Sequence, residues 1–138
     1  MKIMVSACLL GENCKYNGKN NRSERVLEYI KGHDVISVCP EVLGGLPIPR
    51  VPAEIVDGVV TNREGIVVDN EFRKGAKIAF DLAVKEKVEL VILQSRSPSC
   101  GPKEIYDGTF SKKLLKGQGI FAKMLLDAGI PFVDVEDL

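Results

Sequence analysis

The four cysteines, Cys8, Cys14, Cys39 and Cys100, are the side chains of this sequence best able to bind a metal or to act as nucleophiles. Thiols are kept reduced in the cytosol, so cysteines of a cytoplasmic protein are more often metal ligands or catalytic groups than disulfide partners. Cysteine is also among the residue types most often buried for packing alone. The positions of the four cysteines relative to the predicted strands therefore decide between these interpretations.

Three of the cysteines follow predicted buried strands. Short runs rich in Val, Ile and Leu are typical of parallel strands covered on both faces, and three such runs are Lys2–Ala7, Asp34–Val38 and Val88–Leu93. Cys8 directly follows the first run, Cys39 directly follows the second, and Cys100 lies in the loop after the third. Since ligands of such sheets bind outside the carboxyl ends of the strands, we expect these three thiols to converge there.

An iron–sulfur cluster suits three converging thiols better than the other chemistries of cysteine. A Cys–His nucleophile pair needs a nearby histidine, but the only histidine, His33, opens the strand that Cys39 follows. At about 3.3 Å per residue the two lie roughly 20 Å apart. Structural zinc sites favour close cysteine pairs, whereas the nearest two here, Cys8 and Cys14, have five residues between them. A [4Fe–4S] cluster normally takes four thiolates, so three cysteine ligands would leave one iron without a protein ligand. Cys14 is either the fourth ligand, bound to that iron, or a nearby free thiol.

Helical patterns between the strands indicate an α/β fold. Three helices are predicted: one capped by Ser23, a longer one opened by Asp69, and one over residues 119–128. The Asp57-Gly58 pair predicts a tight hairpin, and Pro131–Val135 a fourth strand. Strands that alternate with helices predict a mainly parallel sheet of about four strands, covered by helices on both faces. We expect residues 1–138 to form one domain.

Composition and charge restrict the possible classes of function. The chain has 138 residues, of which 45% are hydrophobic and 28% charged, a balance typical of globular domains. Nineteen Lys and Arg residues balance nineteen Asp and Glu residues, which makes nucleic acid an unlikely partner. No apolar run reaches the roughly 20 residues that a membrane span needs, and the start MKIMVSACLLG becomes polar too early for a signal peptide. The expected location is cytoplasmic, and the sequence leaves the oligomeric state open.

Three motifs occur in a fixed order along the chain. They are SACLLG at 6–11 with Tyr16 and Gly18 beyond it, CPEVLGGLPIPR at 39–50, and SRSPSCG at 95–101 followed by IYDGTF at 105–110. On these motifs, which extend over nearly the whole chain, the sequence resembles the bacterial thiouracil desulfurase family. The resemblance implies a small Rossmann-like three-layer sandwich that holds a [4Fe–4S] cluster through Cys8, Cys39 and Cys100. It also implies removal of sulfur from thiolated nucleobases without net redox change.

The resemblance also implies roles for three further residues. Glu41 would be the catalytic acid and base, and Ser97 and Ser99 would contact a small thiolated substrate. The plainer interpretations are a solvated loop carboxylate for Glu41 and turn caps for the two serines. The resulting hypothesis is that the substrate's sulfur binds the open iron, Glu41 activates a water, and hydrosulfide is released. An iron–sulfur sensing module and a sulfur carrier acting through Cys14 are the alternatives.

Overall fold

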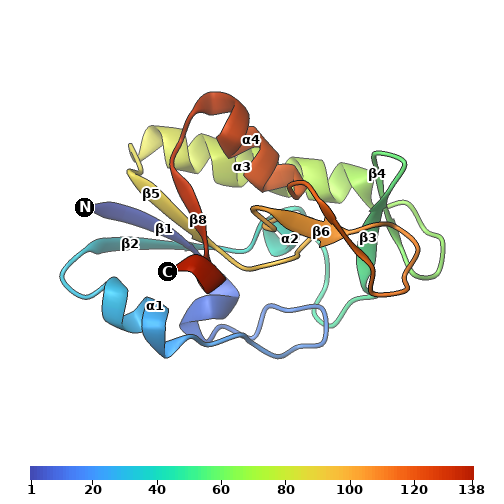
Figure 1. Cartoon of the computed structure of the whole chain (residues 1–138), viewed down its shortest axis with the longest axis horizontal. Helices are drawn as coiled ribbons and strands as arrows, with labels where there is room; N and C mark the ends of the chain where they lie inside the picture. The colour runs from blue at the N-terminus through green and yellow to red at the C-terminus, as the bar shows by residue number, and fades with distance from the viewer.

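A four-stranded parallel sheet forms the centre of the computed structural model, which describes all residues from Met1 to Leu138 (Figure 1). The strands lie in the order β2-β1-β5-β8, and each neighbouring pair is parallel. Their bounds are Lys2–Ser6 for β1, Asp34–Val38 for β2, Leu90–Leu93 for β5 and Phe132–Asp134 for β8. The predicted sheet is confirmed, although β1 ends at Ser6 because Ala7–Leu10 winds into a 3-10 helix.

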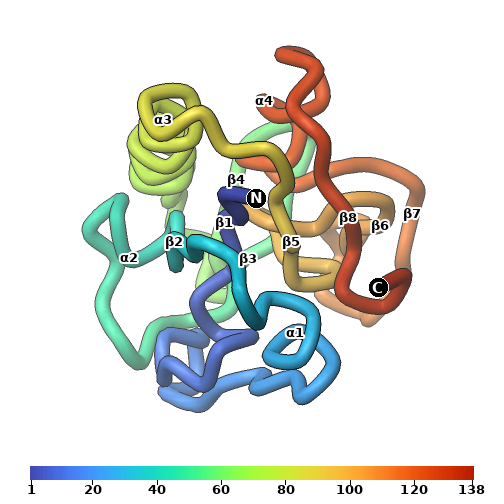
Figure 2. The backbone as a smooth tube through the Cα atoms, turned by 90° about the vertical axis from the view of Figure 1, so that its left-hand side faces the viewer, coloured from blue at the N-terminus to red at the C-terminus, as the bar shows by residue number.

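Helices cover both faces of this sheet and give the fold three layers (Figure 2). The covering helices are α1 (Glu24–Tyr29), α3 (Asp69–Lys85) and α4 (Ile120–Ala128). Side chains alternate along β1, so Met4 joins the core beneath α3 and α4, while Ile3 and Val5 join the core beneath α1. Burial on both faces explains the near-continuous apolar runs that predict the strands. None of the helices is both long and apolar enough to cross a membrane.

The helix ends follow from residues that the sequence pattern singles out. Ser23 Oγ accepts the backbone N–H of Val26 at 3.3 Å and so caps α1. The long helix α3 begins at Asp69, as predicted. The helix α4 lies between Gly119 and Gly129, and Gly129 takes the left-handed conformation (φ 71°) that commonly ends helices. Local chemistry therefore accounts for the start of α1 and the end of α4.

Two β-hairpins lie beyond the carboxyl ends of the sheet strands (Figure 1). Their strands are β3 (Ala53–Val56) with β4 (Val59–Asn62), and β6 (Glu104–Tyr106) with β7 (Leu114–Lys116). The first turns at Asp57 and Gly58, both at positive φ (49° and 81°), as the predicted tight turn requires. The sequence pattern does not predict the second hairpin, because all three residues of β7 are exposed and show no alternation.

One buried carboxylate joins the two hairpins. Glu54, on β3, accepts through its Oε1 the backbone N–H groups of Gly108 at 3.0 Å and Phe110 at 3.1 Å, both in the loop between β6 and β7. The carboxylate thereby satisfies two donors that would otherwise be left without partners where the hairpins meet. The hairpins therefore form one continuous wall beyond the sheet.

A short helix that the sequence pattern does not predict, α2 (Pro40–Leu43), crosses α3 at two glycines. Gly44, at the end of α2, lies against the carbonyl oxygen of Glu71, and Gly75, within α3, lies against that of Pro40. A Cβ atom at either glycine would overlap these backbone atoms, which have no freedom to rotate away. The close crossing therefore fixes the position of α2, and with it the chain that leaves β2.

We expect Gly75→Ala to lower the free energy of unfolding by about 3 kcal/mol, because overpacking against rigid backbone is costly. Urea denaturation followed by circular dichroism measures this change. Lys74→Ala, at the exposed neighbouring position of the same helix, is the matched control and should change stability by less than about 0.5 kcal/mol. Equal stability of the two variants would mean that the crossing of α2 and α3 tolerates displacement.

Candidate active site

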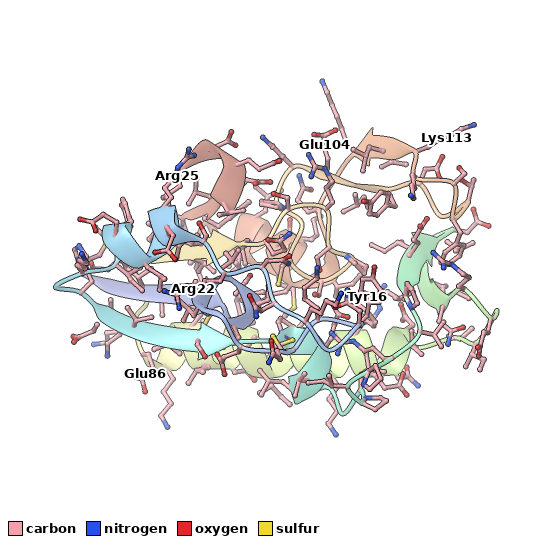
Figure 3. The ribbon with its side chains drawn as sticks, turned by 90° about the horizontal axis from the view of Figure 1, so that it is seen from below. Tyr16, Arg22, Arg25, Glu86, Glu104 and Lys113 are labelled. Atoms are coloured by element: carbon pink, nitrogen blue, oxygen red, sulfur yellow. The ribbon has the colours of Figure 1, made fainter.

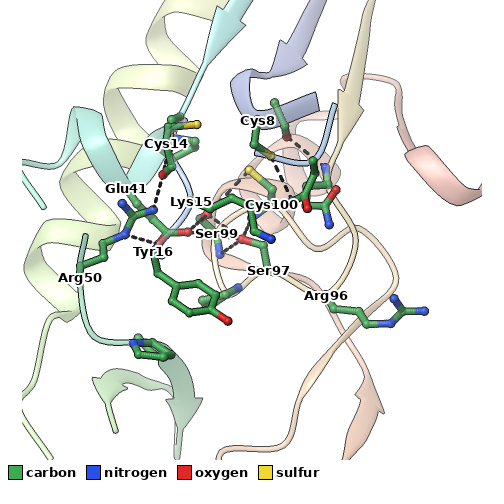
Figure 4. Close-up of a pocket in the computed structure, with 18 of the residues that line it drawn as sticks. Cys8, Cys14, Lys15, Tyr16, Glu41, Arg50, Arg96, Ser97, Ser99 and Cys100 are labelled. Atoms are coloured by element: carbon green, nitrogen blue, oxygen red, sulfur yellow. Dashed lines mark hydrogen bonds and ion pairs between the residues drawn. The ribbon is translucent and has the colours of Figure 1, made fainter. Parts of the chain in front are cut away.

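A cavity of about 390 Å³ opens at the carboxyl edge of the sheet, and all four cysteines line it (Figure 4). The chain that follows β1, β2 and β5 forms one side, and the two hairpins contribute Glu54, Tyr106 and Phe110 to the other. Tyr16, on the N-terminal loop, also lines the cavity (Figure 3). The cavity therefore lies at the edge where the strand order predicts a ligand site.

The three cysteines predicted to converge reach the cavity from the ends of three different strands. Cys8 lies on the 3-10 turn after β1, Cys39 directly precedes α2, and Cys100 lies in the loop after β5. Cys8 and Cys100 are buried, and Cys39 is half-buried. The structure thus brings these thiols together at one edge of the sheet.

Cys14 also lines the cavity, and its backbone carbonyl accepts the thiol of Cys39 at 3.8 Å. It is buried, with 8% of its surface exposed. The segment that carries it folds back toward the sheet, where the backbone N–H of Arg50 donates to the carbonyl of Tyr16 at 2.7 Å. This contact between distant parts of the chain has no local sequence signal, so strand positions alone do not place Cys14 in the site.

Burial and mutual contact disfavour the ionised forms of three thiols, those of Cys14, Cys39 and Cys100. Interaction with the side chain of Cys14, followed by burial, raises the pKa of Cys39. Interaction with Cys39 lowers the pKa of Cys14, but interaction with Cys8 and burial outweigh it and raise that pKa to about 11. Burial raises the pKa of Cys100 to about 12, against the lowering effect of two serine hydroxyls. A positively charged metal centre between the thiols would reverse this balance and release their protons.

The side chains around the cysteines fit a metal cluster. Asn21 Nδ2 donates to Cys8 Sγ at 3.6 Å, and the Ser99 hydroxyl lies 3.7 Å from Cys100 Sγ. Hydrogen bonds of this kind stabilise ligand thiolates and tune the potential of iron–sulfur clusters. A chain with three strand-end thiols, each in a partly apolar and hydrogen-bonded setting, can therefore hold a group that spans the cavity.

Two other chemistries match the arrangement less well. The only histidine, His33, stacks on Tyr29 with ring centroids 6.3 Å apart and does not line the cavity, so no Cys–His pair forms. No three His, Cys, Asp or Glu side chains are grouped so as to hold a single metal ion. A zinc site needs such a group, because its ligands all surround one ion at 2.0–2.3 Å.

The carboxylate of Glu41 is largely buried and bound by other side chains instead of being solvated, since only 16% of its side chain is exposed. It lies in the first turn of α2. Its Oε2 accepts the hydroxyls of Ser99 at 2.9 Å and Ser97 at 3.5 Å, and its Oε1 accepts Nε–H of Arg50 at 3.1 Å. Both oxygens are therefore oriented by the protein, next to the loop that carries Cys100.

The two serines of the loop after β5 lie beside Glu41, and Ser97 also has the turn-capping role expected from the sequence. Ser97 Oγ accepts the backbone N–H groups of Ser99 at 3.1 Å and Cys100 at 3.0 Å, so it shapes the turn. The hydroxyls of Ser97 and Ser99 also lie 2.9 Å apart and both face Glu41. The loop after β5 therefore delivers a thiol and two hydroxyls to one side of the cavity.

Arg50 is a site residue that the sequence pattern does not single out. It ends the CPEVLGGLPIPR motif, and that placement is the only signal that associates it with the cysteines. The structure pairs it with Glu41, nine positions earlier in the chain, and leaves only 7% of its side chain exposed. A pairing across such an irregular loop follows no helical or strand spacing, so sequence periodicity could not reveal it.

The charged side chains that line the cavity are mainly cationic. Arg50 is paired with Glu41 and Arg96 with Glu136, whereas three further lining residues have no carboxylate within ion-pair distance: Lys15, Arg63 and Lys112. A concave site lined by cations in excess attracts anionic ligands over long range. The cavity therefore favours a ligand with negative charge.

Comparisons with known proteins relate this chain to thiouracil desulfurases. The model of a family described as 2-thiouracil desulfurase matches residues 3–137. The uncharacterized protein YbbK of Bacillus subtilis (strain 168) is 36% identical over 146 residues, which cover 99% of this chain and 97% of YbbK. A solved structure of the [4Fe-4S]-dependent thiouracil desulfidase TudS superimposes with a TM-score of 0.93 at 36% identity, over 99% of this chain and 92% of that one.

Proposed function

We propose, on the premise that this chain belongs to the 2-thiouracil desulfurase family, that it replaces the sulfur of a thiolated nucleobase, or of a similar thiocarbonyl compound, by oxygen. The family match confirms the resemblance drawn from the three motifs. The observation that carries the proposal is the convergence of three strand-end thiols around one cavity, beside the held carboxylate of Glu41. Residues 1–138 act as one domain in this proposal.

In this proposal Cys8, Cys39 and Cys100 hold a [4Fe–4S] cluster, and Cys14 is a neighbouring thiol that is not a ligand. The similar desulfidase TudS is described as [4Fe-4S]-dependent. The convergence of the three thiols on one cavity supports a group held between them. When bound, the cluster supplies a Lewis acid that polarises the carbon–sulfur bond of the substrate.

Glu41 acts as the general base and then as the general acid. Its Oε2, oriented by the two serine hydroxyls, takes a proton from a water molecule that attacks the thiocarbonyl carbon. A carbon–oxygen bond forms, the carbon–sulfur bond breaks, and the proton returns from Glu41 to the products as sulfur leaves in the form of hydrosulfide. The carbon keeps its oxidation state, so the reaction needs no electron donor.

Ser97 and Ser99 contact the substrate as well as Glu41 in this proposal. Their hydroxyls face the same part of the cavity as Glu41 Oε2, which supports polar contacts with the substrate beside the reacting atoms. The substrate is small, because the whole cavity measures about 390 Å³. The unpaired cations Lys15, Arg63 and Lys112 favour a substrate that carries a negatively charged group, such as a thiolated nucleotide.

Anaerobically purified protein should contain about four iron and four acid-labile sulfide per chain. Cys8→Ala, Cys39→Ala and Cys100→Ala should each lose the cluster absorbance, whereas Cys14→Ala, the matched control from the same cavity, should keep it. Loss of iron in Cys14→Ala would instead favour a closed cluster and the sensing alternative. A wild-type protein that binds no iron after reconstitution would exclude the proposed function.

Glu41→Gln should lower the turnover of 2-thiouracil by about 100-fold or more, since general acid–base catalysis typically contributes 10²–10⁴ in rate. Iron content should not change, because Glu41 is not a ligand in this proposal. Sulfide release measured against iron content separates these effects. Glu86→Gln, which removes a carboxylate paired with Lys2 outside the cavity, is the control; full turnover in Glu41→Gln with an intact cluster would show that another group moves the proton.

A thiolated uridine monophosphate should have a higher kcat/KM than uncharged 2-thiouracil at low ionic strength. In the double variant Arg63→Ala/Lys112→Ala this advantage should fall by about 10-fold, and 0.5 M salt should reduce it in the wild type by screening. Lys116→Ala, an exposed lysine of β7 that does not line the cavity, should leave both substrates unaffected. Equal kcat/KM for the charged and uncharged substrates would contradict the preference.

A further inference from the structure

Arg50 is a buried cation whose three guanidinium nitrogens all donate to acceptors of the protein. Nε donates to Glu41 Oε1 at 3.1 Å, Nη2 to the carbonyl of Cys14 at 2.8 Å, and Nη1 to the carbonyl of Pro47 at 3.3 Å. Only 7% of its side chain is exposed. A planar guanidinium is suited to bind several acceptors at once in fixed directions, which a lysine ammonium is not.

These contacts join three segments that meet at the cavity (Figure 4). The side chain of Arg50 connects the first turn of α2, through Glu41, with the loop that carries Cys14. The backbone N–H of Arg50 binds the same loop again, at the carbonyl of Tyr16. Arg50 therefore sets the distance between Glu41 and the N-terminal loop.

The effect of Arg50 on Glu41 is to fix the plane of the carboxylate. With Oε1 held by Arg50, the other oxygen, Oε2, is directed to the hydroxyls of Ser99 and Ser97. Without the guanidinium, Oε1 loses its only charged partner, and the carboxylate is held through Oε2 alone, by the two serine hydroxyls. Displacement of a catalytic group by about 1 Å can cost 10²-fold in rate.

We propose that Arg50 is a positioning residue that acts through Glu41: it orients the carboxylate for proton transfer and does not itself bind the substrate. This inference rests on the function proposed above. It differs from the proposed role of Lys15, Arg63 and Lys112, which line the cavity without carboxylate partners and face an anionic ligand.

A double-mutant cycle between Arg50 and Glu41 tests the inference. Arg50→Lys keeps the positive charge but loses the planar guanidinium that donates to three acceptors. In the wild-type background it should lower kcat by about 10- to 100-fold, with KM changed less than about twofold, since ground-state binding is not involved. In the Glu41→Gln background, where there is no carboxylate to orient, the same substitution should have no further effect on kcat.

Arg73→Lys is the matched control. Arg73 also bridges a carboxylate and a carbonyl, with Nε 2.7 Å from Asp69 Oδ2 and Nη2 3.0 Å from the carbonyl oxygen of Gly58, but it lies outside the cavity. Its substitution should leave kcat and KM unchanged. Iron content and the melting temperature of each variant report whether folding is intact, and Arg50→Gln, which retains an amide donor without charge, replaces Arg50→Lys if the latter does not fold.

The outcomes separate this inference from the proposed function. Equal losses of kcat in both backgrounds would overturn the positioning role, and a raised KM with unchanged kcat would mean that Arg50 binds the substrate directly. Loss of iron in the folded Arg50 variants would assign the residue to the cluster site instead. If wild-type protein with a full cluster releases no sulfide from any thiolated substrate, the proposed function fails, and the positioning role fails with it.

Discussion

The parallel register of β1 with its neighbours is the constraint on which the rest of the structure depends. Ser6 pairs with Val38 at the ends of β1 and β2, so the residues that follow them, including Cys8 and Cys39, emerge side by side at one edge of the sheet. A shift of the pairing by one residue would turn every side chain of a strand to the opposite face. The thiols would then separate, and the two buried cores would lose their apolar contacts as well. Sheet stability and site geometry are therefore set by the same contacts.

The carboxylate beside the thiols depends on packing at a greater distance. The glycine crossing of α2 and α3 sets the path of the chain after Cys39, and so the place where Glu41 begins its turn. Arg50 and Ser99 then fix the two oxygens of that carboxylate. The arginine and the glutamate stabilise each other, because either charge alone would be buried without a partner. The orientation of one acidic group thus depends on helix packing, a loop and an ion pair together.

The sequence predicts those parts of the molecule that local chemistry determines. Apolar runs locate the strands and Ser23 locates the start of α1, and strand ends bring Cys8, Cys39 and Cys100 to one edge. The four residues of α2 are too few for a helical period to appear. The positions of Cys14 and Arg50 depend on loops that fold back over long separations in the chain, so no spacing rule applies to them. The family resemblance, carried by whole motifs, supplied Glu41 and the serines where periodicity could not.

The joined hairpins carry none of the four cysteines and neither Glu41 nor its partners, yet they form one wall of the cavity. The buried carboxylate of Glu54 joins them through two backbone N–H groups, and Gly108 packs against the backbone of Ile55. The residues to which the proposed function assigns the reaction are thus separate from this wall of the cavity. Loop lengths, aromatic groups and charges in the wall can vary among lineages while the reacting groups stay in place. The hairpins are accordingly the segment in which to introduce diversity when a desulfurase is evolved in the laboratory toward an unnatural thiocarbonyl compound.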